Sequence, residues 1–367
     1  MSRALEFLDM TPVQIFGRGR AGGGDKKGEV GIEIECEGHN LLLDPSKWWK
    51  GIADGSLRGE SIEYILHAPI DRAKVLESLD LLSKELAQHG SKVNESYRTS
   101  VHVHLNAQPM KMRHVFNQIC LYLILEDILV EYCGKERIGN VFCLRASDAE
   151  GMIDRIRRAI KKGEYANMGQ DGMRYAAINT KALADHGSLE FRAFRGTVDP
   201  KLINQWVEIL LEIKDAAMKY DNPQQICVDF SVLGPKAFVE KVFTANNQRA
   251  ILAYPNFEKR LFDGVRLAQD IAYSIPDWTP VKVDGLKPGD FMDVEGFPEP
   301  PRGRRVGAPQ AINWAIRGAD EVRWHNPVAF AGGGGGGIPF QRIMDPIDEL
   351  MDDEPIDRHD DDEDDDF

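Results

Sequence analysis

Apolar and acidic residues alternate strictly in residues 31–38, which read Gly-Ile-Glu-Ile-Glu-Cys-Glu-Gly. Successive side chains of a β-strand point to opposite faces, so the alternation predicts a strand with Glu33, Glu35 and Glu37 on one face. Neighbouring carboxylates on that face would lie roughly 7 Å apart, where like charges repel each other. A divalent cation or arginine side chains would relieve this repulsion. An edge strand whose acidic face lies in water is the alternative interpretation.

Three further segments alternate in the same way and predict further strands. Each of them carries carboxylate, imidazole or guanidinium groups on one face and apolar side chains on the other. These polar residues are Glu63 in segment 61–67, His102 and His104 in segment 100–106, and Glu190 and Arg192 in segment 188–195. Residues 174–179 predict one more strand.

Apolar residues at helical spacing predict several helices between and after these strands. With helices on one face of a mostly antiparallel sheet, the polar residues of the strands would line a cleft on the other face. The sequence therefore predicts an α+β fold of this kind. The expected helices cover residues 71–89, 113–132, 147–163, 199–213, 235–243 and 256–273.

The two ends of the chain differ in composition from its middle. Residues 1–28 are glycine-rich and basic, which predicts a flexible arm, and residues 29–275 form the expected catalytic domain. Residues 276–344 are rich in proline and glycine and predict a largely irregular region. Residues 345–367 predict a disordered acidic tail that could bind a protein partner.

The charge is concentrated in that tail. It holds 14 Asp or Glu and one Arg, a net charge of −13, so the other 344 residues carry −14 + 13 = −1. This nearly neutral part has no basic stripe of the kind that nucleic-acid-binding proteins use, and we expect no nucleic-acid partner. No apolar run is long enough to span a membrane, and we expect no membrane association. Five cysteines without a CxxC pair suit reduced thiols, so we expect a cytoplasmic protein.

The strand motifs together resemble the amidoligase family, which is common in bacteriophages and bacteria. The family belongs to the carboxylate-amine ligase superfamily of glutamine synthetase and glutamate-cysteine ligase. The resemblance spans roughly residues 29–213 and implies a glutamine synthetase-like catalytic fold. The motifs that carry it, in chain order, are Gly-Ile-Glu-Ile-Glu, Asp-Gly-Ser followed by Glu63, His-Val-His, Arg-Tyr-Ala-Ala-Ile-Asn and Leu-Glu-Phe-Arg-Ala-Phe-Arg-Gly-Thr-Val-Asp.

The resemblance also implies roles for individual residues. The acids of the strands would hold Mg²⁺ or Mn²⁺, and the histidines and arginines would contact ATP or a substrate carboxylate. Glu37 and Glu60 depart from the family pattern, since each adds an acid next to the expected ligands. The implied metal ligands are Glu33, Glu35, Glu63, His104 and Glu190; the implied nucleotide-binding residues are His102, His104, Arg174, Arg192 and Arg195; the implied catalytic residues are Arg192, Glu190 and Glu63.

The reaction implied is ATP- and Mg²⁺-dependent joining of a carboxylate to an amine. Phosphoryl transfer from ATP would convert the carboxylate into an acyl phosphate, which the amine attacks to form an amide or isopeptide bond. The partners would be small-molecule or peptide carboxylates and amines.

Two alternatives remain open on the sequence alone. The paired histidines and the glutamates also suit a metal-dependent hydrolase, which would not need a nucleotide. A non-catalytic phage structural or binding protein could retain the same fold and would turn over no ATP.

Overall fold

The computed structural model describes residues 7–16, 28–94, 96–149, 151–163, 165–169 and 175–279, without the side chains of residues 166 and 167. Arg174 therefore lies outside the described residues, as do residues 280–367, which include nearly all of the proline- and glycine-rich region and the whole acidic tail. The predictions for these segments stay predictions.

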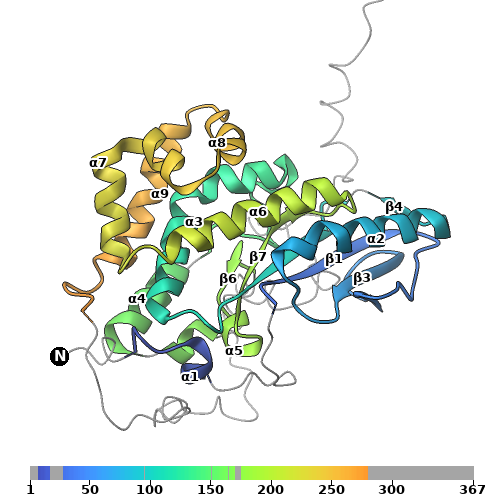
Figure 1. Cartoon of the computed structure of the whole chain (residues 1–367), viewed down its shortest axis with the longest axis horizontal. Coiled ribbons are helices and arrows are strands. Elements are labelled where there is room, and N and C mark those ends of the chain that lie inside the picture. The colour runs from blue at the N-terminus through green and yellow to red at the C-terminus, as the bar shows by residue number, and fades with distance from the viewer. Residues whose placement is uncertain are drawn as a thin grey trace, which may run out of the picture. The chain divides into compact units, whose positions relative to one another are not determined.

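A mostly antiparallel sheet with helices packed around it forms the fold, which confirms the predicted α+β class (Figure 1). The strands follow the order β2-β3-β1-β5-β7-β6, and β4 pairs with the far end of β1. Every strand pairing is antiparallel. The strands are β1 (Val30–His39), β2 (Trp49–Ala53), β3 (Glu60–Leu66), β4 (Lys92–Asn94), β5 (Ser100–Asn106), β6 (Ile178–Asn179) and β7 (Ser188–Arg195).

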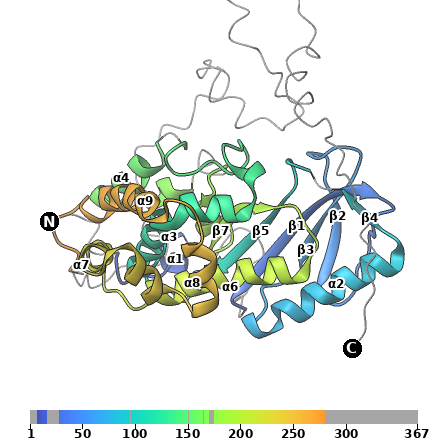
Figure 2. The same ribbon diagram turned by 90° about the horizontal axis from the view of Figure 1, so that it is seen from above.

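The helices cover the sheet and form a second layer beyond it, in which α3, α6, α7 and α9 lie together (Figures 1 and 2). No helix in the described part of the chain has the length and apolar character needed to cross a membrane. The helices are α1 (Pro12–Phe16), α2 (Val75–His89), α3 (Met112–Cys133), α4 (Met152–Lys162), α5 (Ala182–Asp185), α6 (Pro200–Ala217), α7 (Pro223–Val242), α8 (Ala245–Leu252) and α9 (Phe257–Ala272), with short 3₁₀ turns at η2 (Arg72–Lys74), η3 (Lys135–Arg137) and η4 (Tyr165–Gly169).

Local sequence signals explain where two helices begin or end. The side chain of Asp199 accepts hydrogen bonds from the backbone amides of Lys201 and Leu202, and Pro200 occupies the first turn, so α6 begins there. Gly90, at φ 79°, ends α2 in the left-handed conformation that glycine adopts without strain. Both boundaries match the sequence prediction.

Helices α3 and α9 approach each other closely because α9 carries a glycine at their contact. A Cβ atom added to Gly264 would lie 2.4 Å from the carbonyl oxygen of Ile124 on α3. Helix α3 is buried along nearly its whole length, as its apolar sequence predicts. The described residues include all five cysteines, and each is buried and has a free thiol.

Residues 7–16, which lie within the segment predicted as a flexible arm, pack on the helical layer. Phe7 and Leu8 are buried, and the carbonyls of Leu8 and Met10 accept hydrogen bonds from the amides of Arg113 and Met112 at the start of α3. The segment thus caps a helix whose first amides need acceptors. Apolar side chains within the predicted arm were the overlooked signal.

The described residues just past the predicted boundary at residue 275 also pack on the core. The indole of Trp278 is buried, donates a hydrogen bond to the carbonyl of Ala272 (2.8 Å), and packs edge-on against the ring of Phe116. The aromatic ring adds apolar burial at the end of α9, so it keeps the chain on the core past the predicted boundary.

Candidate functional site

The strand register gathers the predicted polar residues on one face of the sheet. Glu33 on β1 lies opposite His102 on β5, and His104 lies opposite Glu190 on β7. Opposed residues on neighbouring strands have Cβ atoms about 5 Å apart, so these side chains must interact. On the other side of β1, Glu35 lies opposite Glu63 of β3.

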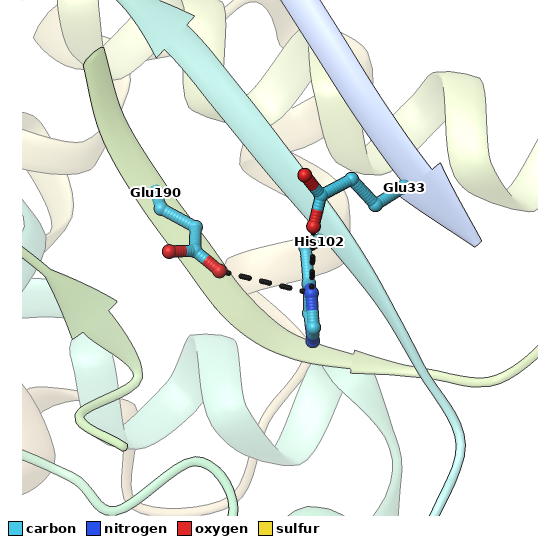
Figure 3. Close-up of side chains that lie close together, drawn as sticks. All are labelled: Glu33, His102 and Glu190. Atoms are coloured by element: carbon cyan, nitrogen blue, oxygen red, sulfur yellow. Dashed lines mark hydrogen bonds and ion pairs between the residues drawn. The ribbon is translucent and has the colours of Figure 1, made fainter. Parts of the chain in front are cut away.

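The imidazole of His102 lies at the centre of this cluster (Figure 3). Its Nδ1 is 3.3 Å from Oε2 of Glu33 and 3.7 Å from Oε1 of Glu190. Its Nε2 is 3.8 Å from Oε1 of Glu35. The side chain of His102 is only 3% exposed, so these charges meet where water screens them little.

Ser100 fixes the orientation and the tautomer of His102. Its hydroxyl donates to Oε2 of Glu35 (2.7 Å), because an ionised carboxylate can only accept. The same hydroxyl oxygen is 2.7 Å from Nε2 of His102, so that nitrogen must supply the hydrogen. The backbone amide of Ser100 also donates to Glu35 (2.9 Å). The Nδ1 atom of His102 consequently faces the carboxylates of Glu33 and Glu190.

This donor set suits a divalent cation. Glu33, His102 and Glu190 offer ligand atoms that all lie within 4.8 Å of one another. Two carboxylate oxygens and an imidazole lone pair repel one another unless a proton or a metal ion lies between them. The hydrogen bond from Nε2 to Ser100 is the kind of outer contact that orients a metal-binding histidine. The residues therefore fit a metal ion.

A second group of potential ligands adjoins the first. Glu35, Glu63 and His102 also offer atoms within 4.8 Å of one another. His102 would have to contribute Nε2 to this group, and Ser100 already occupies that nitrogen. The first group is therefore the better metal site, and Glu35 and Glu63 border it.

Arg192 balances the charge of Glu190 at one side of the cluster. Its Nη1 donates to Oε1 of Glu190, and the amide of Asn179 donates to the other carboxylate oxygen. Burial alone would raise the pKa of Glu190, but Arg192, His104 and His102 lower it to about 2. The Nε atom of Arg192 is buried and has no hydrogen-bond partner among the described residues. This donor is left for a ligand such as a phosphate or carboxylate oxygen.

Glu33 and Glu63 respond to the cluster in opposite ways. Burial would raise the pKa of Glu33, but the two histidines, His104 first, hold it well below its ordinary value. For Glu63, burial and the charges of Glu33 and Glu35 outweigh the opposing charge of Arg192 and raise the pKa to about 8. Glu63 is thus a carboxyl that can hold or release a proton near neutral pH.

His104 lies beside the central histidine. Its Nε2 is 3.4 Å from Oε1 of Glu33, and its Nδ1 is 3.1 Å from the hydroxyl of Ser188. Burial lowers the pKa of His104, but the carboxylate of Glu33 outweighs this and raises it overall. His104 therefore holds Glu33 in place, and the grouped atoms that could hold a metal ion come from His102 rather than His104.

Three residues near the predicted site point elsewhere. The guanidinium of Arg195 donates to the carbonyl of Cys133 at the end of α3 (3.3 Å) and lies over the ring of Phe194, so it belongs to the helical layer. Glu37 accepts from the amide of Arg58, and Glu60 accepts from the amides of two loop residues, 40 and 41. The two extra acids therefore organise loops.

Sequence reasoning missed Ser100, Asn179 and Ser188, which contact the cluster directly. Ser100 shares the alternating face of His102 and His104, so its position was a usable signal. Asn179 ends the motif Arg-Tyr-Ala-Ala-Ile-Asn, and Ser188 begins the strand of Glu190.

Residues 60–214 match the model of a protein family described as "Putative amidoligase enzyme". The match confirms the resemblance that the strand motifs predicted, and it points to an enzyme of the ligase type. It includes Glu63, both histidines of β5, Glu190 and Arg192, and it begins after the strand of Glu33 and Glu35. No curated protein matches the chain.

Proposed function

We propose that this protein is an ATP- and Mg²⁺-dependent carboxylate-amine ligase that forms an amide or isopeptide bond. The observation that carries the proposal is the cluster of Glu33, His102 and Glu190 beside the partly buried guanidinium of Arg192. Grouped oxygen ligands next to an arginine are what a metal-nucleotide complex requires. The match to an amidoligase family over residues 60–214 supports the same conclusion.

Glu33, His102 and Glu190 would hold the metal ion, which would be Mg²⁺ or Mn²⁺. When bound, the ion would neutralise negative charge on the phosphates of ATP. Glu35 stays fixed by Ser100 at the border of this group. His104 keeps Glu33 oriented by its contact with Oε1.

The chain's own residues account for the two chemical steps. In the first step a substrate carboxylate oxygen attacks the γ-phosphorus of ATP, the bond to the ADP oxygen breaks, and an acyl phosphate forms. Arg192 would donate its unpaired Nε–H to the transferring phosphoryl group. In the second step the amine nitrogen attacks the acyl carbon and phosphate leaves. Glu63, whose pKa is about 8, would accept the proton that the amine loses.

No covalent protein intermediate is needed, and the side chains nearest the cluster do not suit one. The Ser100 hydroxyl donates its proton to Glu35, so it cannot pass that proton to His102 in the manner of a serine nucleophile. Cys36 lies on the opposite face of β1, where burial raises its thiol pKa to about 12. A thiolate nucleophile is therefore absent from the described part of the site.

The test is ATP consumption in the presence of mixed carboxylates and amines. We expect ADP and phosphate to form only when a suitable acid and amine are both present. Mass spectrometry should then find a product whose mass equals the two substrates minus one water. There are two controls. One is the parental protein with the mixed carboxylates but no amines, and the other is the Glu190→Gln variant with both mixtures.

A metal-dependent hydrolase is the second candidate, because the same Glu33–His102–Glu190 group would suit it. Such an enzyme would cleave amide or ester bonds with Mn²⁺ or Zn²⁺ and no nucleotide. Bond cleavage that ignores ATP would replace the ligase proposal with this one. Binding of neither metal nor nucleotide would remove both.

A further inference from the structure

Arg137, at the end of the short η3 turn after α3, is a buried arginine whose guanidinium binds mainly backbone carbonyls and also interacts with the thiol of Cys143. Its side chain is among the least exposed in the protein, at 1%. It donates to four carbonyl oxygens on two segments of chain. These are the carbonyls of Ala193 (2.9 Å), Arg192 (3.0 Å), Thr99 (3.3 Å) and Tyr97 (3.4 Å).

No carboxylate in the described part of the chain forms an ion pair with Arg137. A buried cation usually has an acidic partner, because desolvation of a charge is costly. Here the planar fork of donors replaces that partner by meeting several carbonyl dipoles at once. The role of Arg137 therefore follows from the two backbone segments that its guanidinium links.

The two segments meet at an irregularity in the sheet. Val101 on β5 lies opposite Phe194, and Val103 lies opposite Phe191, so β7 has one extra residue over this stretch. Such a bulge leaves backbone groups without their regular partners in the ladder. The carbonyls of Arg192 and Ala193 lie in the bulged stretch, and Arg137 supplies their donors.

The bulge decides which side chains enter the site. Glu190, before the bulge, and Arg192, within it, both point to the cluster. After it, the ring of Phe194 stacks on Trp206 of α6, with centroids 5.7 Å apart and planes 11° apart. On the opposite segment, the carbonyl of Thr99 immediately precedes Ser100, which orients His102 and Glu35.

We propose that Arg137 is a positioning residue that sets the geometry of the candidate metal site through the backbone of β7 and of the segment before β5. It fixes the bulge of β7, which carries Glu190 and Arg192, and the entry to β5, which carries Ser100. It touches no substrate and acts only through these residues. The inference rests on the metal-binding part of the proposed function, not on the identity of the reaction.

Mn²⁺ affinity of the full-length protein, read by electron paramagnetic resonance of the free ion, tests this directly. Lysine presents three donors from one point and cannot reach carbonyls on both segments. We expect Arg137→Lys to weaken Mn²⁺ binding about tenfold, as for outer contacts of other metal sites. Arg260→Lys is the matched control, since Arg260 binds acidic residues of α3 on the helical side. It should retain affinity within about twofold of the parent.

A double-variant cycle with Ser100→Ala distinguishes positioning from general destabilisation. If Arg137 acts through Ser100, the double variant should lose much less than the product of the two single losses. Two independent tenfold losses would instead multiply to about a hundredfold. Full multiplication, or parental affinity in Arg137→Lys, would overturn the proposal.

If the Arg137 variants do not fold, Asn140→Ala decides the question. Asn140 is more exposed and donates to the carbonyl of Tyr97, one of the four that Arg137 binds. Its loss should weaken Mn²⁺ binding by roughly two- to threefold, and unchanged affinity would contradict positioning through this segment.

Failure of this inference can be told from failure of the ligase proposal. A parent that binds Mn²⁺ but not ATP ends the ligase proposal and leaves the Arg137 test intact. If the parent consumes ATP and the Arg137→Lys variant binds Mn²⁺ as tightly as the parent, the ligase proposal stands and the role of Arg137 is overturned. A parent that binds no Mn²⁺ overturns the positioning role.

Discussion

Glu126 in the helical layer and Glu190 in the polar cluster of the sheet are buried almost equally, at 2% and 5% exposure, yet they are accommodated in opposite ways. Glu126 accepts one backbone hydrogen bond, from Ala146, and its other carboxylate oxygen has no hydrogen-bond partner among the described residues. Burial raises its pKa to about 8. Glu190 has Arg192 and two histidines beside it, which lower its pKa to about 2.

The difference separates two regions of the protein. The helical layer tolerates a carboxyl by keeping it protonated, since no cation reaches Glu126 strongly enough to keep it ionised. The polar cluster of the sheet keeps Glu33 and Glu190 ionised by placing cationic groups around them. Keeping several charges buried costs desolvation free energy, so this arrangement indicates a site that binds a charged ligand.

Glu33→Gln should reduce Mg-ATP binding more than about a hundredfold, because it removes a charge that the metal would compensate. Glu35→Gln, at the border of the group, should reduce it less, by about tenfold. Neither variant should unfold, and the melting temperature should stay level or rise as repulsion falls. Isothermal titration calorimetry measures the affinity. Glu37→Gln is the control on the same strand, since Glu37 binds the amide of Arg58. Parental affinity in both variants would exclude these acids from the site.

Arg192→Lys should keep the fold and much of the nucleotide affinity but lower turnover about a hundredfold. An ammonium group cannot reproduce the planar donors that a phosphoryl group would meet. Steady-state kinetics with a substrate pair found in the ATP screen measure the effect. Arg195→Lys should remain near parental turnover, because Arg195 is directed to Cys133. Equal losses in both would refute the assignment of Arg192.

Glu126→Gln should stabilise the protein increasingly as the pH rises from 5 to 8. In the parent, the native state keeps a proton on Glu126 up to about pH 8, whereas the unfolded chain releases it near its ordinary pKa of 4.5. Stability must therefore fall with rising pH in this window, and glutamine removes that fall. We expect a gain of about 2–3 kcal/mol at pH 8 relative to pH 5.

Urea unfolding at several pH values measures this gain. Gln can still accept the hydrogen bond from the amide of Ala146, so the helix contact persists. Glu77→Gln, at an exposed ion pair on α2, is the control and should show no such trend. A pH-independent difference between parent and Glu126→Gln would mean that Glu126 is ionised in the native state.

Gly264→Ala should lower the free energy of unfolding by about 2 kcal/mol, because its Cβ would meet the Ile124 carbonyl at 2.4 Å. Affinity for Mn²⁺ should not change, since the contact lies between α3 and α9. Denaturant unfolding and metal titration on the same sample read both effects. Gly55→Ala, where an added Cβ meets nothing within 4 Å, serves as the control. A loss of metal affinity in Gly264→Ala would show that the two regions are coupled.

Ser100→Ala should weaken Mn²⁺ binding about tenfold with little change in stability. In this variant the Nε2–H group of His102 loses its acceptor, and Glu35 loses the hydrogen bond from the hydroxyl. Ser100→Thr keeps the hydroxyl and should restore most of the affinity. Equal Mn²⁺ affinity in Ser100→Thr and Ser100→Ala would show that the hydroxyl does not orient the imidazole.

The sheet and the polar face could be predicted because period-two alternation is a local property of the sequence. It placed Glu33, His102, His104 and Glu190 on one face, and the family resemblance implied His104 as the metal ligand. The structure instead groups His102 with the carboxylates, and this grouping depends on pairing register and on Ser100, whose hydroxyl contacts Nε2 of His102. Contacts between strands far apart in sequence leave no local pattern.

The bulge in β7 was invisible to the same reasoning. Strict alternation puts Phe194 on the face of Glu190, whereas the structure stacks it on Trp206 in the helical layer. The extra residue is stabilised by Arg137, which comes from a turn more than 50 residues earlier in the chain. Predicting it requires knowing that a distant cation meets those carbonyls.

The burial of all five cysteines gives the protein a set of built-in reporters of local opening. Burial raises the thiol pKa of each, to about 12 for Cys36 and about 11 for Cys227, so an alkylating reagent meets almost no thiolate in the closed state. Cys36 lies on β1 behind the cluster, Cys120 and Cys133 lie on α3, and Cys227 lies on α7. The order in which a reagent labels them would map the sequence in which sheet and helices open, residue by residue and without any mutation.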